Sequence, residues 1–146
     1  MDKITEYVLA TRPWSLTASI VPILVTLAVV DYDILSINFL RAITMGISIQ
    51  AAANLTNTYF DYANGLDNAK SAAEGTGEKT LVEKKISVNG LLFLSICLYT
   101  LGTVAVSPLL LKCWPTLLTF LSGTFLAFFY TATPLGLKYV ALGLRF

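Results

Sequence analysis

The sequence contains no histidine, and charged residues make up only 13% of its 146 positions. Soluble domains carry about 25% charged residues, so this chain is depleted in charge. The absence of histidine excludes imidazole acid–base catalysis and the usual ligation of zinc or haem through imidazole. The two cysteines, Cys97 and Cys113, lack the spacing of a metal or redox motif. A net charge of +1 gives no indication of a nucleic-acid partner, and we expect none.

Hydrophobic residues are abundant instead, at 55% of the chain, and they gather in four long runs. A membrane-spanning helix needs about 20 apolar residues, with a lower limit near 17. We therefore expect spans over residues 14–30, 37–60, 90–111 and 114–132. Residues 2–11 are mixed in charge and amphipathic, which predicts a short helix lying at the membrane interface. The expected fold class is all-α, a polytopic transmembrane bundle of four spans plus this N-terminal interfacial helix.

The distribution of Lys and Arg predicts how such a bundle is oriented. With four crossings, one side of the membrane carries eight cationic residues: Lys3, Arg12, Lys70, Lys79, Lys84, Lys85, Lys138 and Arg145. The other side carries only Arg41 and Lys112. Positive residues favour the cytosolic side, so we expect the N-terminus and the long polar segment at residues 62–87 to lie in the cytosol.

The end of the second apolar run carries an unusual polar stripe. Gln50, Asn54, Asn57 and Asp61 follow one another at intervals of four, three and four residues, so a helix places them on one face. Polar groups are costly in hydrocarbon, and this face must therefore contact protein or a wet cavity.

The oxygen atoms of this stripe suggest a metal site. Asn57 and Asp61 are one helical turn apart, and Asp67 follows just beyond a turn at Gly65. Amide and carboxylate oxygens are hard ligands that suit Mg²⁺, an ion that often bridges protein carboxylates and substrate phosphates. The alternative is a helix end at which Asn and Asp cap the turn, with no ligand.

Several motifs resemble those of the UbiA superfamily of membrane prenyltransferases, with spacing nearest to its menaquinone (vitamin K) branch. The resemblance rests on Arg12-Pro13-Trp14-Ser15 and on residues 54–62, 65–67, 79–82 and 129–143. It implies a nine-span bundle around a central cavity, of which residues 1–143 would be the N-terminal part. Residues 144–146 depart from the family pattern, and a second Asp-rich motif would be expected after them. We therefore expect a truncated form of the family domain.

The same resemblance implies roles for individual residues. Catalytic roles fall on Asp61, Asp67 and Lys138, and Mg²⁺ ligation on Asn57, Asp61 and Asp67. Substrate-binding roles fall on Arg12, Asn54, Asn57, Lys79 and Tyr130. The implied substrates are a polyprenyl diphosphate of geranylgeranyl type and an aromatic, naphthoquinol-type acceptor, as in menaquinone, vitamin K or ubiquinone biosynthesis.

Two alternatives remain open at this point. The chain could be a non-catalytic membrane protein that acts by associating with full-length subunits, and a homo- or hetero-oligomer is compatible with either function. It could also be part of a transporter, although the polar stripe stops at one membrane face. The resemblance favours an integral protein of the endoplasmic reticulum or Golgi membrane, with the mitochondrial membrane as a second location.

Overall fold

The computed structural model describes residues 2–30, 33–75, 77–112 and 114–140. These residues form the elements α1 Lys3–Ala10, η1 Pro13–Leu16, α2 Thr17–Val29, α3 Ile37–Ala63, α4 Ala69–Ala73, α5 Lys79–Val82, α6 Val88–Leu110, α7 Trp114–Phe129 and α8 Leu137–Val140. No strand occurs in these four ranges, which confirms the all-α fold class. The domain boundary expected at residue 143 lies outside the described residues.

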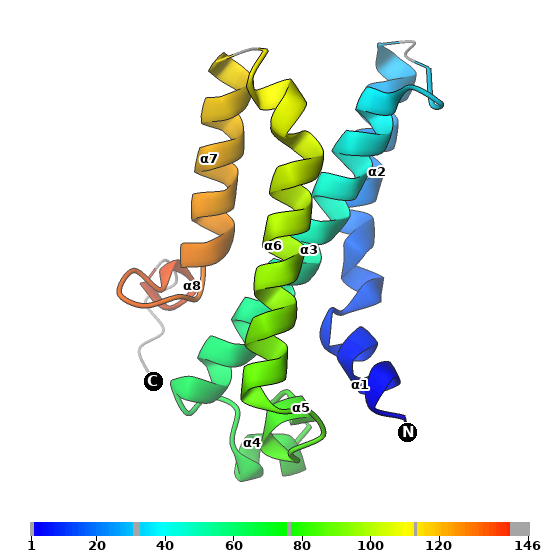
Figure 1. The fold of residues 1–146 in the computed structure, drawn as a ribbon. Coiled ribbons are helices and arrows are strands. Elements are labelled where there is room, and N and C mark those ends of the chain that lie inside the picture. Colours follow the sequence, from blue (N-terminus) through cyan, green and yellow to red (C-terminus); the bar gives the residue numbers. More distant parts are fainter. Residues whose placement is uncertain (1, 31–32, 76, 113, 141–146) are drawn as a thin grey trace.

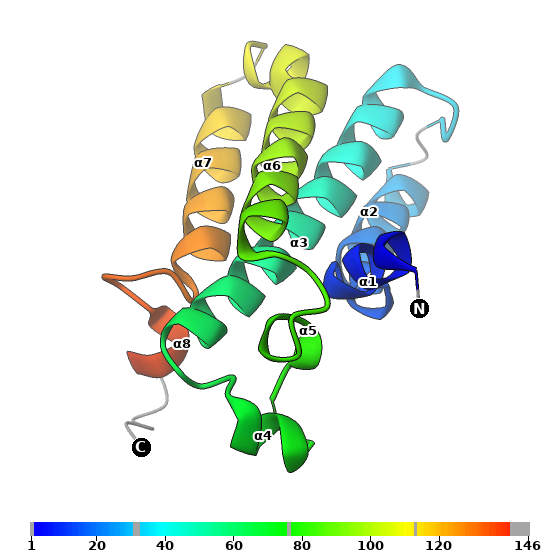
Figure 2. The same ribbon diagram turned by 60° about the horizontal axis from the view of Figure 1, so that its bottom comes forward.

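The long helices α2, α3, α6 and α7 run between two ends of the molecule (Figure 1). Helix α3 lies centrally and packs most extensively against α6, then against α2. The short elements α1, α4, α5 and α8 gather at one end, as both views show (Figures 1 and 2). The polar stripe on α3 leads to that end, so the short elements surround it.

Local sequence signals explain where these helices begin. The Ser36 side chain accepts a hydrogen bond from Phe39 N at the start of α3, and the Ser87 side chain accepts one from Gly90 N at the start of α6. A helix forms as α1 where the sequence predicts one, and its interfacial position remains a prediction. Helix α1 is separated from η1 by Thr11 and Arg12, and the backbone of Arg12 is left-handed (φ 53°). This break turns the chain from α1 into the bundle.

The contact between α3 and α6 combines apolar and small polar side chains. Leu55 and Leu91 are fully buried there. The hydroxyl oxygens of Thr56 and Ser95 are 3.1 Å apart, and Ser95 Oγ also donates to Ala52 O at 3.2 Å. Small and hydroxyl side chains let membrane helices approach closely and satisfy their polar groups across the interface.

Two helical stretches of the described chain are long and apolar enough to cross a membrane. They are Lys3–Val29, which comprises α1, η1 and α2, and Val88–Leu110. Helix α7 is apolar but has only 16 residues, and α3 does not meet the same criterion. The structure therefore supports a helical membrane protein, while the four crossings expected from the sequence remain a prediction.

Leu91→Ala tests whether the α3–α6 contact carries the stability of the bundle. We expect a loss of about 2–5 kcal/mol, because removing a buried leucine side chain loses its burial and leaves a cavity. Thermal unfolding in detergent would measure it. Phe93→Ala is the control on the same helix, since Phe93 is 69% exposed, and an equal loss in both variants would contradict this packing.

Candidate functional site

The turn that follows α3 positions the two carboxylates of the candidate site. Gly65 adopts a left-handed backbone (φ 76°), which glycine tolerates without a steric penalty. The backbone N–H groups of Leu66 and Asp67 then donate to the carbonyl of Asp61 at 2.9 and 3.1 Å. This closure resembles the hydrogen-bonded helix ends in which glycine follows the last turn. It brings Asp67 back beside Asp61.

Asp61 is buried and accepts hydrogen bonds from two adjacent residues of α8. Lys138 Nζ lies 2.9 and 2.8 Å from its two carboxylate oxygens, and Tyr139 Oη donates to Oδ1 at 2.5 Å. Burial, together with the bond to the carboxylate, raises the pKa of Tyr139. The phenol therefore remains a donor. Asp61 thus connects the end of α3 to α8, 77 positions later in the chain.

Only one of the two carboxylate oxygens of Asp67 has a hydrogen-bond partner among the described residues. Its Oδ1 accepts a hydrogen bond from the backbone N–H of Glu78 at 2.9 Å. Gly77 permits this approach, because a Cβ there would overlap the Ser71 side chain and lie 3.1 Å from Asp67 Oδ1. Burial, followed by the charges of Asp61 and Glu78, raises the pKa of Asp67, although the bond from Glu78 N opposes the rise. The two aspartates are therefore close enough for their charges to interact.

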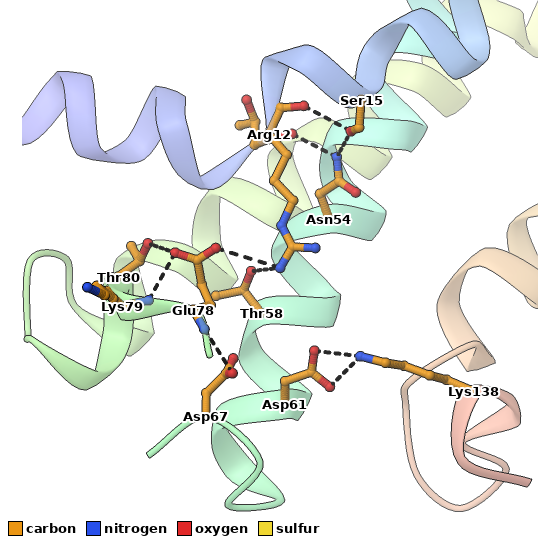
Figure 3. A network of polar contacts seen from close by, with 11 residues as sticks. Arg12, Ser15, Asn54, Thr58, Asp61, Asp67, Glu78, Lys79, Thr80 and Lys138 are labelled. Atoms are coloured by element: carbon orange, nitrogen blue, oxygen red, sulfur yellow. Dashed lines mark hydrogen bonds and ion pairs between the residues drawn. The ribbon is translucent and has the colours of Figure 1, made fainter. Parts of the chain in front are cut away.

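Arg12 and Glu78 connect the N-terminal segment to the same site. The Arg12 guanidinium donates to Thr58 Oγ1 at 3.4 Å and lies 3.8 Å from the Glu78 carboxylate. Glu78 also accepts from Thr80 Oγ1 at 2.7 Å at the start of α5. Figure 3 shows Arg12, Glu78, Asp67 and Asp61 following one another along one side of α3.

The upper part of the polar stripe bonds to the segment that leads into α2. Asn54 Nδ2 donates to Thr11 O at 2.8 Å and to Ser15 Oγ at 2.7 Å (Figure 3). One turn earlier, Gln50 Oε1 accepts from Ser19 Oγ at 3.3 Å. The stripe therefore contacts protein, which the cost of polar groups in hydrocarbon requires.

Two oxygen atoms of this site are buried and have no hydrogen-bond partner among the described residues: Asn57 Oδ1 and Asp67 Oδ2. Buried polar atoms are rarely left unpaired, and a water molecule, an ion or a ligand normally completes such a group. Together with the Asp61 carboxylate, whose oxygens accept from Lys138 and Tyr139, these oxygens are of the kind that suits Mg²⁺ when substrate oxygens complete the coordination. No cluster of three or more His, Cys, Asp or Glu residues suited to a metal occurs in the described residues, so protein carboxylates alone do not form a full metal cage.

The structure brings together most of the residues expected at the site. Arg12, Asn54, Asn57, Asp61, Asp67 and Lys138 all lie along or beside the last three turns of α3. Lys79 and Tyr130 do not join them. Lys79 is exposed and points away from the aspartates in Figure 3, and the Tyr130 side chain is 51% exposed.

Sequence reasoning missed Tyr139 and the bridging role of Glu78. Tyr139 directly follows the predicted Lys138, and this adjacency was a signal that the short α8 presents two donors. Glu78 holds Asp67 through a backbone N–H, which side-chain patterns do not show.

Apolar helices of membrane-spanning length, with a cluster of carboxylate, ammonium and amide groups at one end of the bundle, are the features of a helical membrane protein with a polar site. The chain belongs to the UbiA prenyltransferase family, whose family model matches residues 19–143.

Individual relatives are similar over almost the whole chain. UbiA prenyltransferase domain-containing protein 1 from Xenopus tropicalis and from Homo sapiens are each 34% identical over 97% of the chain. The Drosophila melanogaster homolog is 33% identical over the same share. The chain spans 41%, 42% and 40% of the lengths of these three proteins, respectively. No solved structure matches the chain.

Asp67→Asn tests the electrostatic state of the site. Because the folded protein raises the pKa of Asp67, the ionised carboxylate costs stability, and this cost grows as the pH rises through the folded-state pKa. We expect Asp67→Asn to unfold at an equal or higher temperature than the wild type at pH 8, with the difference vanishing below the ordinary Asp pKa. Asp33→Asn, on an exposed turn, should show no such pH-dependent difference. A clearly lower unfolding temperature for Asp67→Asn at pH 8 would contradict this assignment.

Proposed function

We propose that this chain takes part in Mg²⁺-dependent transfer of a polyprenyl group from an allylic diphosphate to an aromatic acceptor. The observation that carries the proposal is the pair of buried, unpaired oxygens at the end of α3, Asn57 Oδ1 and Asp67 Oδ2, beside the Asp61 carboxylate. Membership of the UbiA prenyltransferase family supports the reaction class. The naphthoquinol-type acceptor of the menaquinone branch is the acceptor that we propose.

The residues at the site would divide the binding of the diphosphate between them. Asn57, Asp61 and Asp67 would hold Mg²⁺, which supplies positive charge to the leaving diphosphate oxygens. Lys138 is at hydrogen-bond distance from Asp61 and its side chain is one-third exposed (33%), so its ammonium group is available to neutralise charge that develops on the same oxygens. Arg12, held beside Thr58 and Glu78, would supply a second fixed cation.

Apolar space for a prenyl chain lies further along the bundle, on the part of α3 that precedes the candidate site. A cavity of about 380 Å³ lies between α2, α3, α6 and α7, with Ile49, Val106 and Phe120 among its lining residues. Aromatic rings gather nearer the site: the centroids of Phe60 and Phe128 are 6.3 Å apart and perpendicular. An allylic cation is stabilised by aromatic faces that exclude water.

We further propose the membrane arrangement in which this chemistry works. The four long helices would cross the bilayer as part of a larger, nine-span bundle, and the end that holds α1, α4, α5 and α8 would face the cytosol. Seven of the eight cations assigned to that side are described, and they lie on or next to these short elements. An endoplasmic reticulum or Golgi membrane suits this orientation.

Asp67→Asn is the direct test of the metal assignment, since we expect this variant to fold at least as well as the wild type. It should lose Mn²⁺ binding, measured by electron paramagnetic resonance in place of Mg²⁺, and at least about 100-fold of prenyl transfer from labelled geranylgeranyl diphosphate. Asp33→Asn should retain both. Wild-type Mn²⁺ affinity in Asp67→Asn would disprove the metal site, whereas a wild type that binds metal and diphosphate without transfer would disprove the activity.

Lys138→Met separates two roles of the Lys138 ammonium group, which are pairing with Asp61 and binding of the substrate diphosphate. Because Lys138 is paired with Asp61, a metal ion must compete with it for that carboxylate. We expect Lys138→Met to bind Mn²⁺ alone about two- to five-fold more tightly, and to bind a non-reactive prenyl thiodiphosphate more weakly. Calorimetry would measure the second effect, with Lys70→Met as the control. Weaker Mn²⁺ binding in Lys138→Met would show that the ammonium does not compete for Asp61.

A further inference from the structure

A second polar cavity lies at the same end of the molecule but does not include the residues of the candidate site. It has a volume of about 470 Å³ and is formed by α1, the end of α3 and the connection between α5 and α6. Its polar lining residues are three lysines, two tyrosines and one serine: Lys3, Lys84, Lys85, Tyr7, Tyr62 and Ser87. In Figure 2, α1 lies beside α5 and the start of α6.

Tyr7 fixes the shape of this cavity by docking α1 on the bundle. Its ring packs against the buried core cluster that includes Leu81, Ile86 and Leu91. Its hydroxyl lies over Gly90, where any Cβ would overlap it. Core packing therefore places α1 at the cavity, where Lys3 comes from α1 and Lys84 and Lys85 come from the connection between α5 and α6.

The cationic groups of the cavity are only partly neutralised. No acidic residue lines it among the described residues. Lys85 pairs with Glu83 at 3.2 Å, whereas the ammonium groups of Lys3 and Lys84 make no ion pair within the described part of the chain. Lys84 also adopts a left-handed backbone (φ 54°), which is unfavourable for a residue with a side chain. Unfavourable backbone conformations of this kind occur often at functional sites.

The position of the cavity indicates the kind of anion that would reach it. Ile4, Val8 and Leu9 of α1 are 71%, 52% and 38% exposed, an apolar surface that an interfacial helix buries at the boundary between head groups and acyl chains. Ser87 caps the membrane-length helix α6, so the cavity lies where that helix leaves the apolar layer. The N-terminus of α6 adds positive potential at this level.

We propose that this cavity binds a phosphate-bearing anionic group, and that its location assigns it to the head group of an anionic lipid. Lysines at the membrane surface attract such lipids. The inference rests on the placement of the chain in a membrane and goes beyond the proposed transfer reaction, since Asn57, Asp61 and Asp67 take no part in it.

The test compares two double variants of equal charge. Unfolding temperature of the full chain in neutral detergent is measured while dioctanoyl phosphatidylserine or dioctanoyl phosphatidylcholine is added. We expect phosphatidylserine to stabilise the wild type, and Lys3→Gln/Lys84→Gln to weaken its apparent affinity at least about ten-fold. Lys70→Gln/Lys112→Gln, on exposed positions outside the cavity, should behave as the wild type.

Three results would overturn the proposal. Equal weakening in both double variants would show a diffuse charge effect instead of a site. Unchanged affinity in Lys3→Gln/Lys84→Gln would show that the cavity does not bind the lipid. Inorganic phosphate or pyrophosphate that binds as tightly as phosphatidylserine, and is lost in Lys3→Gln/Lys84→Gln, would assign the cavity to a soluble phosphate. These outcomes can be interpreted even if the chain does not transfer prenyl groups, because the experiment measures unfolding temperature and not enzymatic activity.

Discussion

The hydrogen-bonding requirement of the polar side chains on α3 is the constraint on which the rest of the structure depends. A helix in hydrocarbon cannot leave an amide or a carboxylate without a partner, because water is not available to replace it. Three of the four polar residues of the stripe take a partner from another element: Gln50 bonds to Ser19, Asn54 to Thr11 and Ser15, and Asp61 to α8. These bonds fix where α2, the N-terminal hinge and α8 lie around α3.

The same constraint explains why the short elements matter. Helices α1, α5 and α8 have 8, 4 and 4 residues, too few to be stable alone. Each is held by a side-chain contact. Tyr7 of α1 packs against the core cluster, Glu78 at the start of α5 pairs with Arg12, and Lys138 of α8 pairs with Asp61 at the end of α3. The end of α3 therefore organises segments that are distant in sequence into one polar surface.

Much of the fold was predictable because it depends on periodicity. Apolar runs and caps such as Ser36 and Ser87 fix the long helices locally, and the 4-3-4 spacing of the stripe defines one helical face.

The site was predictable only in part. Family resemblance predicted that Asp61, Asp67 and Lys138 belong to one site. It did not predict the backbone bond from Glu78 to Asp67, because a main-chain donor carries no residue-specific signal. Nor did it predict that Lys79 and Tyr130 would face outward, since short helices and turns set those directions.

The polar atoms that lack a hydrogen-bond partner are the feature that links the fold to the proposed function. If every polar atom on α3 had a partner, the stripe would need no explanation beyond packing. Gln50 and Asn54 fit that description, but Asn57 Oδ1 does not, and neither does Asp67 Oδ2 in the turn that follows α3. Both lie where α3 ends, next to a carboxylate whose counter-ion is a partly exposed ammonium. An arrangement that holds two buried oxygens without partners is unfavourable for folding alone, and a bound cation with its phosphate ligand would relieve that cost.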